Sequence, residues 1–248
     1  MSACRPSEPA MARLPLVLLP GTLCDERVWQ PMLARWGKPV PAQVLTPALR
    51  GSTTVPAMAA ALLDQLPPRF AVMGFSLGGI VALELAAQAP GRVAGLALVA
   101  TNARPDPPGN AARRHAAVAA AREVGLAHHV QADLWPLYVA ARRRDDAGLL
   151  DLVVRMAVDA GLGTYGQQAA MAHDRADGLP RLQALAVPAL VVGGDEDAIN
   201  PRDRQQEMAD RLPQADWVQL PGVGHFVPLE APGELASAAG SWIERVHG

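Results

Sequence analysis

The chain has 248 residues, half of them hydrophobic, and a formal net charge of −2. This length and composition suit one sizeable α/β core, with or without an inserted subdomain. The small net charge gives no indication of a nucleic-acid partner or of binding to an anionic membrane, and no stretch is long and apolar enough to span a bilayer.

Three local features complete this first description. Residues 1–13 lack the apolar segment of a signal peptide, and we expect a disordered leader there. The two cysteines, Cys4 and Cys24, form no disulfide framework, which fits a reducing cytoplasm. The arginines at residues 113–114 and 142–144 are expected on solvated helix faces. We therefore predict a cytoplasmic protein that binds neither nucleic acid nor membranes.

Strand-like and helix-like segments alternate along the chain. The strand candidates are apolar throughout rather than alternating, a pattern typical of parallel strands buried on both faces. They are residues 14–19, 44–46, 70–73, 93–100, 189–192 and 217–220. The helices predicted beside them are residues 58–66, 80–87, 202–212 and 232–246. This order predicts an α/β fold with a mostly parallel sheet of about six strands flanked by helices.

The pattern changes between residues 104 and 178, where the sequence predicts helices only. A proline-rich break opens this segment. The helix candidates within it are residues 111–124, 126–144, 147–160 and 165–175. Pro136 is expected to kink or split the second of them. We therefore predict a helical cap or lid at 104–178, inserted between the core segments 14–103 and 179–248.

Residues 74–79 read Gly-Phe-Ser-Leu-Gly-Gly and lie between a predicted strand and a predicted helix. A serine in Gly-x-Ser-x-Gly at such a turn indicates a nucleophile elbow. Gly74 and Gly78 have no Cβ atoms to clash where the turn is tightest. The helix that follows directs its positive N-terminal end at the Ser76 hydroxyl. Ser76 is therefore the candidate nucleophile.

A serine nucleophile needs a base, and the base needs a group that orients it. His225 is the preferred base, because it lies in a glycine-rich loop directly after the last predicted strand. Asp195, Glu196 and Asp197 compete as the orienting acid, and Asp197 leaves most room for the chain to turn after its strand. The order Ser76, Asp197, His225 is one of the known chain orders of a Ser-His-Asp triad, with each residue after a strand of a parallel sheet.

Acyl transfer also requires an oxyanion hole of hydrogen-bond donors. One expected donor is the backbone N–H of Leu77, directly after the nucleophile. The other is expected in the loop after the first strand, where we favour the N–H of Thr22, with that of Leu23 as second choice. Cys24 lies in the same loop, and we interpret it as a small packing residue because no base is placed for it.

The predicted cap offers apolar side chains that could line an acyl site. The pocket candidates are Leu134, Trp135, Leu137, Tyr138, Met156 and Met171 of the cap with Leu23 and Phe226 of the core. The alternative is that residues at helical spacing pack the cap onto the core. No group of histidines, cysteines or carboxylates has the spacing of a metal site, so we expect neither metal nor cofactor.

With these motifs in place, the chain from Leu14 onward resembles the α/β-hydrolase superfamily. In detail it is similar to small cap-bearing serine esterases, including carboxylesterases and the pimeloyl-ACP methyl ester esterase branch. Haloalkane dehalogenases and epoxide hydrolases carry Asp at the elbow, and Ser76 argues against both. One departure is Pro20-Gly21, where many relatives have His-Gly.

The resemblance implies a serine hydrolase that cleaves carboxylic esters through an acyl-enzyme, with a small acyl ester as its substrate. Carbon–carbon bond hydrolases, lactonases and acyltransferases use the same triad and stay open as alternatives. A protein that binds a ligand on this scaffold without catalysis is the other class. The sequence does not assign an oligomeric state.

Overall fold

The computed structural model of this protein describes residues 13–37, 41 and 43–248. Of the predicted leader, all but Arg13 lies outside the described residues, and so does Cys4. Within the described part, six strands form one sheet in the order β2-β1-β3-β4-β5-β6. The strands are β1 (Leu16–Leu19), β2 (Val44–Leu45), β3 (Phe70–Phe75), β4 (Val93–Val99), β5 (Ala189–Gly194) and β6 (Ala215–Leu220).

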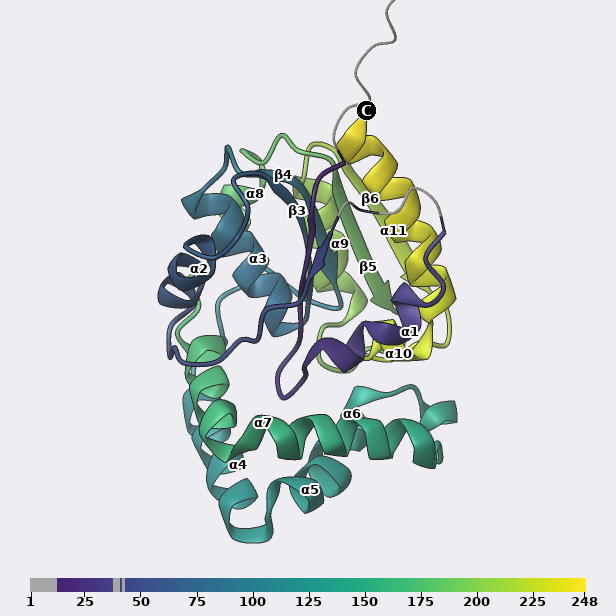
Figure 1. Cartoon of the computed structure of the whole chain (residues 1–248). Coiled ribbons are helices and arrows are strands. Elements are labelled where there is room, and N and C mark those ends of the chain that lie inside the picture. Colours follow the sequence, from purple (N-terminus) through teal and green to yellow (C-terminus); the bar gives the residue numbers. More distant parts are fainter. Residues whose placement is uncertain (1–12, 38–40, 42) are drawn as a thin grey trace, which may run out of the picture.

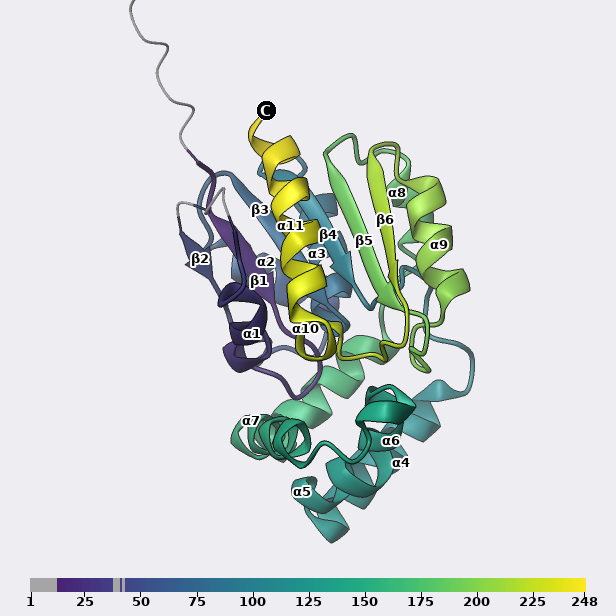
Figure 2. The same ribbon diagram turned by 90° about the vertical axis from the view of Figure 1, so that its right-hand side faces the viewer.

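Every pair of neighbouring strands is parallel. Helices cover both faces of the sheet, as Figures 1 and 2 show. One face carries α1 (Gln30–Leu33), α10 (Val227–Glu230) and α11 (Pro232–His247). The other carries α2 (Val55–Leu63), α3 (Leu77–Gln88), α8 (Leu179–Leu182) and α9 (Arg202–Arg211). The predicted six-stranded α/β fold is confirmed.

The core consists of two apolar layers, one on each face of the sheet. In β1, Leu16 and Leu18 contact the layer of α1 and α11, while Val17 contacts the layer of α2 and α3. Successive strand residues point to opposite faces, so a strand covered on both sides has no position for a polar side chain. Fully burying one such leucine contributes about 1.5–3 kcal/mol. This explains why the four central strands are apolar throughout, whereas the edge strand β6 carries Asp216 and Gln219.

Helix α2 begins and ends three residues earlier than the predicted helix at 58–66. Thr54 caps it, because its side chain accepts a hydrogen bond from the Ala57 N–H at 3.3 Å. Pro56 occupies the first turn, where a missing N–H costs nothing. The short helices α1, α8 and α10 were not expected. None of the described helices is both long and apolar enough to cross a membrane.

Helices of the inserted segment lie at the carboxyl ends of the strands (Figure 1). They are α4 (Asn110–Val124), α5 (Leu126–His129), α6 (Trp135–Tyr138) and α7 (Ala147–His173). The predicted helix at 126–144 is split near Pro136, as expected. A π-helical turn, Val130–Leu134, follows α5, and α6 begins with Pro136 in its first turn and ends at Tyr138.

Helix α7 covers the two predicted helices at 147–160 and 165–175. Gly161 interrupts it with non-helical backbone angles, φ 80° and ψ 161°. This positive φ is a conformation that glycine adopts readily, so α7 bends between the two predicted segments. The cap boundaries at 104 and 178 stay a prediction.

Candidate active site

The turn between β3 and α3 holds Ser76 in an unusual conformation, with φ 51° and ψ −115°. A Cβ atom on Gly74 would lie 2.3 Å from the Gly78 carbonyl oxygen, and one on Gly78 would lie 2.2 Å from the Leu19 carbonyl oxygen. Only glycine fits at both positions. The strained serine is fixed on its carbonyl side, where Thr101 Oγ1 donates a hydrogen bond at 2.7 Å.

Ser76 lies at one end of a continuous chain of hydrogen-bonded groups. Its Oγ is 3.0 Å from His225 Nε2. On the other side of the ring, Nδ1 is 2.9 Å from Asp197 Oδ2 and 3.1 Å from Oδ1. A carboxylate accepts only, so His225 donates through Nδ1 and presents the Nε2 lone pair to the serine hydroxyl. The structure thus brings together the three residues selected from the sequence.

Asp197 is itself held in place. Its side chain is fully buried, and Oδ1 accepts hydrogen bonds from the backbone N–H groups of Ile199 and Asn200, both at 2.8 Å. Asn200 in turn donates from Nδ2 to the Ala100 carbonyl oxygen at 2.8 Å and accepts a hydrogen bond from Asn102. The loop after β5 is therefore tied to the end of β4, which fixes the direction of the carboxylate.

The two competing acids have other partners. Asp195 is exposed and accepts a hydrogen bond from the Gly222 N–H at 2.6 Å. Glu196 is exposed and accepts one from the Ala141 N–H at 3.0 Å. Asp197, the acid preferred for its spacing after the strand, is therefore the one acid of the three that lies beside His225.

A buried carboxylate that no sequence motif predicts holds the loop of His225. Glu230 accepts hydrogen bonds from the backbone N–H groups of Gly224 and Phe226, both at 3.2 Å, and from that of Ala140 at 2.9 Å. Burial raises the pKa of Glu230, and these three N–H groups oppose that rise. An acid inside the apolar run that follows His225 was the available signal.

The loop after β1 approaches the elbow closely, since a Cβ on Gly21 would lie 3.3 Å from Ser76 Cβ. Both Thr22 and Leu77 line the cavity above Ser76. Leu77 is the first residue of α3, so its N–H has no acceptor inside the helix. Among the described residues, the Thr22 N–H has no protein acceptor. These two amides are free to bind an oxyanion.

Leu23, the second choice, does not fit this role. Its N–H donates to Gln168 Oε1 of α7 at 2.8 Å. The same buried amide donates from Nε2 to the Leu49 carbonyl oxygen at 2.9 Å. Leu23 has a positive φ of 58°, which a leucine rarely adopts. Gln168 therefore holds the loop that carries Thr22, a role with no sequence motif to reveal it.

A cavity of about 590 Å³ opens above Ser76 and His225. Its apolar lining includes Leu134, Leu137, Tyr138 and Phe226. Four other predicted pocket residues do not line it and are buried in the interior: Leu23, Trp135, Met156 and Met171. Helical spacing identifies the buried stripe of a helix, and that stripe packs against other elements rather than facing the cavity.

The cavity also has a charged side, formed in part by Arg113 and Arg114 of α4. The sequence predicts a solvated helix face for this pair. Arg113 is exposed and Arg114 is half-buried, but both line the cavity. The correction follows from the position of α4, which covers the carboxyl ends of the strands rather than the outer surface of the core (Figure 1).

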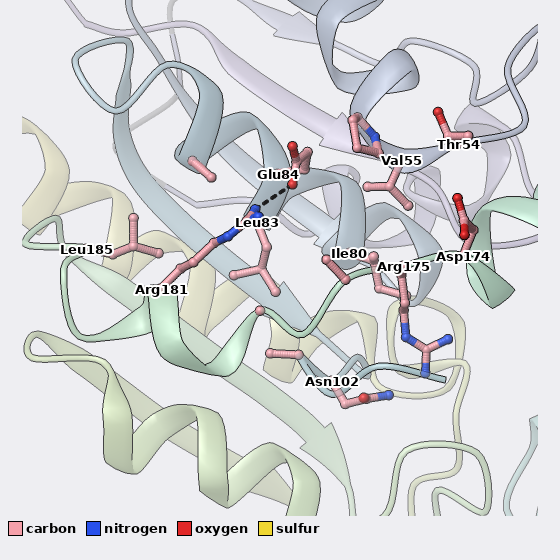
Figure 3. A pocket seen from close by; sticks show the side chains of 15 residues that line it. Thr54, Val55, Ile80, Leu83, Glu84, Asn102, Asp174, Arg175, Arg181 and Leu185 are labelled. Atoms are coloured by element: carbon pink, nitrogen blue, oxygen red, sulfur yellow. Dashed lines mark hydrogen bonds and ion pairs between the residues drawn. The ribbon is translucent and has the colours of Figure 1, made fainter. Parts of the chain in front are cut away.

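A second, smaller pocket of about 240 Å³ lies between α2, α3 and α8 (Figure 3). An ion pair between Arg181 and Glu84, 2.7 Å long, is part of its lining. Ile80, Asn102 and Arg175 line both this pocket and the catalytic cavity. These residues form the wall between the two spaces.

The described part of the chain shows neither a cluster of metal ligands nor a reactive thiol. No group of three histidine, cysteine or acidic side chains there could hold a metal ion. Cys24 is buried, and burial, followed by the charge of Asp25, raises its thiol pKa. Its Sγ donates to the Thr22 carbonyl oxygen at 3.3 Å. A thiol in this environment stays protonated and packs as a small side chain.

Comparison with known proteins gives consistent results. Residues 16–238 match the model of the alpha/beta hydrolase family. The chain is 31% identical to the pimeloyl-(acyl-carrier protein) methyl ester esterase of Aromatoleum aromaticum, over 91% of this chain and 96% of that protein. It is 43% identical to the biotin biosynthesis bifunctional protein BioHC of Cellvibrio japonicus, over 38% of this chain and 20% of that longer protein.

One solved structure extends the comparison to the fold. A thermophilic esterase from Thermogutta terrifontis superposes with a TM-score of 0.79 at 27% sequence identity. The match covers 95% of this chain and 91% of the esterase. The fold is therefore shared with an esterase along nearly the whole chain.

Proposed function

This chain belongs to the alpha/beta hydrolase family, and from that premise we propose that it is a serine hydrolase that cleaves carboxylic esters through an acyl-enzyme. The observation that carries the proposal is the hydrogen-bonded chain from Asp197 through His225 to Ser76. The relatives named as esterases support the reaction class.

In the proposed acylation step, Ser76 Oγ attacks the ester carbonyl while His225 Nε2 accepts its proton. The carbonyl oxygen becomes an oxyanion, which the N–H groups of Thr22 and Leu77 bind. Such donors act strongly because they are fixed before the charge develops; loss of one costs about 10²–10³-fold in kcat. The imidazolium formed on His225 is stabilised by the carboxylate of Asp197.

Departure of the alcohol completes acylation, and deacylation then repeats the same steps with water. His225 first gives its proton to the leaving alcohol, which departs and leaves the acyl group on Ser76. His225 then accepts a proton from a water molecule, which attacks the acyl carbonyl. The second tetrahedral intermediate collapses, releases the acid and returns the proton to Ser76 Oγ. The cycle needs no group beyond those described.

The substrate we propose is a small acyl ester. The cavity above Ser76 combines an apolar lining from Leu134, Leu137 and Phe226 with the polar groups of the triad, as small-molecule sites commonly do. The methyl esters named for two of the relatives are therefore suitable members of a substrate panel. On cysteine usage alone, we propose a cytoplasmic location.

Three further reactions use the same groups. A carbon–carbon bond hydrolase, a lactonase and an acyltransferase would each attack a carbonyl with Ser76 and stabilise an oxyanion. Turnover of a vinylogous diketone that exceeds ester turnover would favour the first of these. A binding protein without catalysis is the other class, and it gives no reason for the arrangement of Ser76, His225 and Asp197.

The test is replacement of the nucleophile. Ser76→Ala should lower kcat for p-nitrophenyl butyrate by about 10⁴-fold or more. Ser237→Ala is the matched control, because Ser237 is exposed on α11, away from the cavity, and it should retain wild-type turnover. Undiminished turnover in the pure Ser76→Ala protein would refute the proposal.

A further inference from the structure

One side of the catalytic cavity carries an excess of positive charge. Arg113, Arg114, Arg175 and Arg204 line it, and Asp106 is the one carboxylate among the described lining residues. The four arginines come from three places far apart in the sequence: the start of α4, the segment after α7, and the first turn of α9. Asp106 lies in the loop before α4. We call these five residues the arginine cluster.

Asp106 binds two of the four arginines. Its Oδ2 accepts a hydrogen bond from Arg114 Nε at 2.8 Å, and its Oδ1 accepts from Arg114 Nη2 at 2.9 Å. Arg175 Nη1 lies 3.1 Å from the same Oδ1. Burial raises the pKa of Asp106, but Arg114, with Asn110 and Arg175, outweighs it and lowers that pKa to about 2. The Asp106 carboxylate is therefore charged, and both of its oxygens are already bound by arginines.

Arg175 is the most buried member, with 6% of its side chain exposed. Its Nε donates to the Arg104 carbonyl oxygen at 2.8 Å, and Figure 3 shows the side chain extending toward the segment that carries Asn102. Burial lowers the pKa of Arg175, and the charges of Arg114 and Arg204 lower it further against the opposing effect of Asp106. The guanidinium groups of Arg114, Arg175 and Arg204 are therefore close enough for their charges to affect one another.

The remaining two arginines have no carboxylate partner within the described residues. Neither Arg113 nor Arg204 forms an ion pair there, although Arg204 is half-buried. The acids on α9 nearest to Arg204 are engaged elsewhere, since Arg104 pairs with Asp203 at 3.6 Å and with Glu207 at 2.7 Å. Four positive charges thus face one negative charge in a concave site.

We propose that the arginine cluster binds an anionic group, a carboxylate or a phosphate, carried by the ester substrate. This rests on the proposed function and names the substrate class of the same site. A guanidinium offers parallel N–H donors that match both anions, and its charge is permanent. Asp106 orients Arg114 and Arg175, while Arg113 and Arg204 supply charge that no carboxylate in the described part of the chain neutralises. The apolar lining would hold the chain between the anion and the ester carbonyl.

The first experiment measures binding without turnover. Ser76→Ala protein is titrated with methyl hexanoate and with monomethyl adipate, which has the same chain length and a terminal carboxylate. The carboxylate ester should bind about 10-fold more tightly, the factor that one charge-assisted hydrogen bond provides. Methyl hexanoate with a terminal phosphate is the third ligand, and whichever anionic ester binds more tightly identifies the source of the anion.

Variants locate the effect. Adding Arg113→Gln and Arg204→Gln to the Ser76→Ala protein should reduce the preference for the anionic ester to less than about twofold. Arg122→Gln is the matched control, because Arg122 is exposed on α4 and does not line the cavity; it should keep the full preference. Equal affinity for neutral and anionic esters, or an undiminished preference in the double arginine variant, would overturn the proposal.

Turnover separates the two proposals. In the wild type, kcat/KM for mono-p-nitrophenyl adipate should exceed that for p-nitrophenyl hexanoate by a similar factor. If the anionic ester binds more tightly but neither ester is hydrolysed, the anion site stands and the esterase proposal fails. If both esters are hydrolysed at the same rate with the same affinity, the esterase proposal stands and the anion site fails.

Discussion

Two loops meet at Ser76, and they are held in different ways. The histidine loop, residues 222–226, is bound by the buried carboxylate of Glu230, which accepts two of its N–H groups. The oxyanion loop, residues 20–25, is bound by the buried amide of Gln168. Glu230 belongs to the core at the end of α10, whereas Gln168 belongs to α7 of the inserted helices.

The difference separates the two halves of the proposed mechanism. A carboxyl group loses its charge and gains a donor when it is protonated, whereas an amide has the same charge at every pH. The histidine loop therefore depends on pH through the group that holds it, and the oxyanion loop does not. The inserted helices also do more than cover the cavity, because Gln168 shapes the backbone of Leu23 beside the oxyanion donor Thr22.

Removing the charge that orients His225 should have the largest effect. Asp197→Asn leaves the size of the side chain unchanged but presents an amide to Nδ1, so the ring is held in the wrong tautomer. We expect kcat to fall by about 10⁴-fold with little change in KM. Steady-state kinetics on p-nitrophenyl butyrate checks this, with the exposed Asp210→Asn as control. A loss of less than tenfold, about 1.4 kcal/mol, would contradict the role of Asp197.

Replacing the holder of the histidine loop should have the next largest effect. Glu230→Gln puts an NH₂ group against N–H donors of Gly224 or Phe226, so at least one hydrogen bond is lost. We expect about 1–3 kcal/mol of destabilisation and a drop of about tenfold in kcat. Denaturant unfolding and kinetics measure both, with the exposed Glu234→Gln as control. Wild-type kcat in the variant would show that Glu230 does not position His225.

The same variant should reveal the pH dependence. Because burial raises the pKa of Glu230 above its ordinary 4.5, the folded state keeps a proton that the unfolded state releases. Stability from this group is present below pH 4.5 and is lost as pH rises through the folded pKa. The unfolding free energy of the wild type relative to Glu230→Gln should therefore fall as pH rises above 4.5. A difference that stays constant with pH would contradict this.

The oxyanion loop should respond more weakly and without pH dependence. Gln168→Leu removes the acceptor of the Leu23 N–H and the donor to the Leu49 carbonyl oxygen. We expect kcat to fall by about 3- to 10-fold, with the same ratio to wild type at every pH. Gln167→Leu is the matched control on the same helix, since Gln167 bonds only the exposed Gly51 N–H among described residues. If Gln168→Leu and Gln167→Leu had equal kcat values, Gln168 would not hold the oxyanion loop.

The smallest effect concerns acid stability at the arginine cluster. The pKa of Asp106, lowered from 3.8 to about 2 in the folded state, means that its stabilisation is present above pH 3.8 and lost as pH falls toward 2. Asp106→Asn should remove this dependence, whereas the exposed Asp145→Asn should keep it. Unfolding free energies measured between pH 2 and 5 test it; parallel profiles for wild type and Asp106→Asn would contradict the ion pairs.

Much of the fold was predictable because it depends on local patterns. Mostly apolar segments identified all six strands, although β6 also includes Ala215 and Asp216, outside the predicted segment 217–220. Gly74 and Gly78 marked the elbow, where no other residue fits. Pro136 predicts that the helix breaks, but a proline does not predict the local geometry of the break. The π-helical turn before α6 depends on packing among the inserted helices.

Site residues that belong to a sequence motif were predictable. Site residues that act only through contacts formed on folding were not. Ser76, Asp197 and His225 were selected by their positions after predicted strands. Glu230 and Gln168 have no such motif, because each acts on backbone groups brought near by folding. The apolar pocket candidates were half wrong for a related reason: periodicity reports burial and does not distinguish a cavity wall from a packed core.

Covalent labelling tests whether Ser76 is an activated nucleophile. The wild-type protein is treated with a fluorophosphonate and its intact mass is measured, followed by peptide mapping. We predict one adduct, located on Ser76 and absent from Ser76→Ala. No adduct on the folded wild type, or an adduct on another residue, would contradict the account.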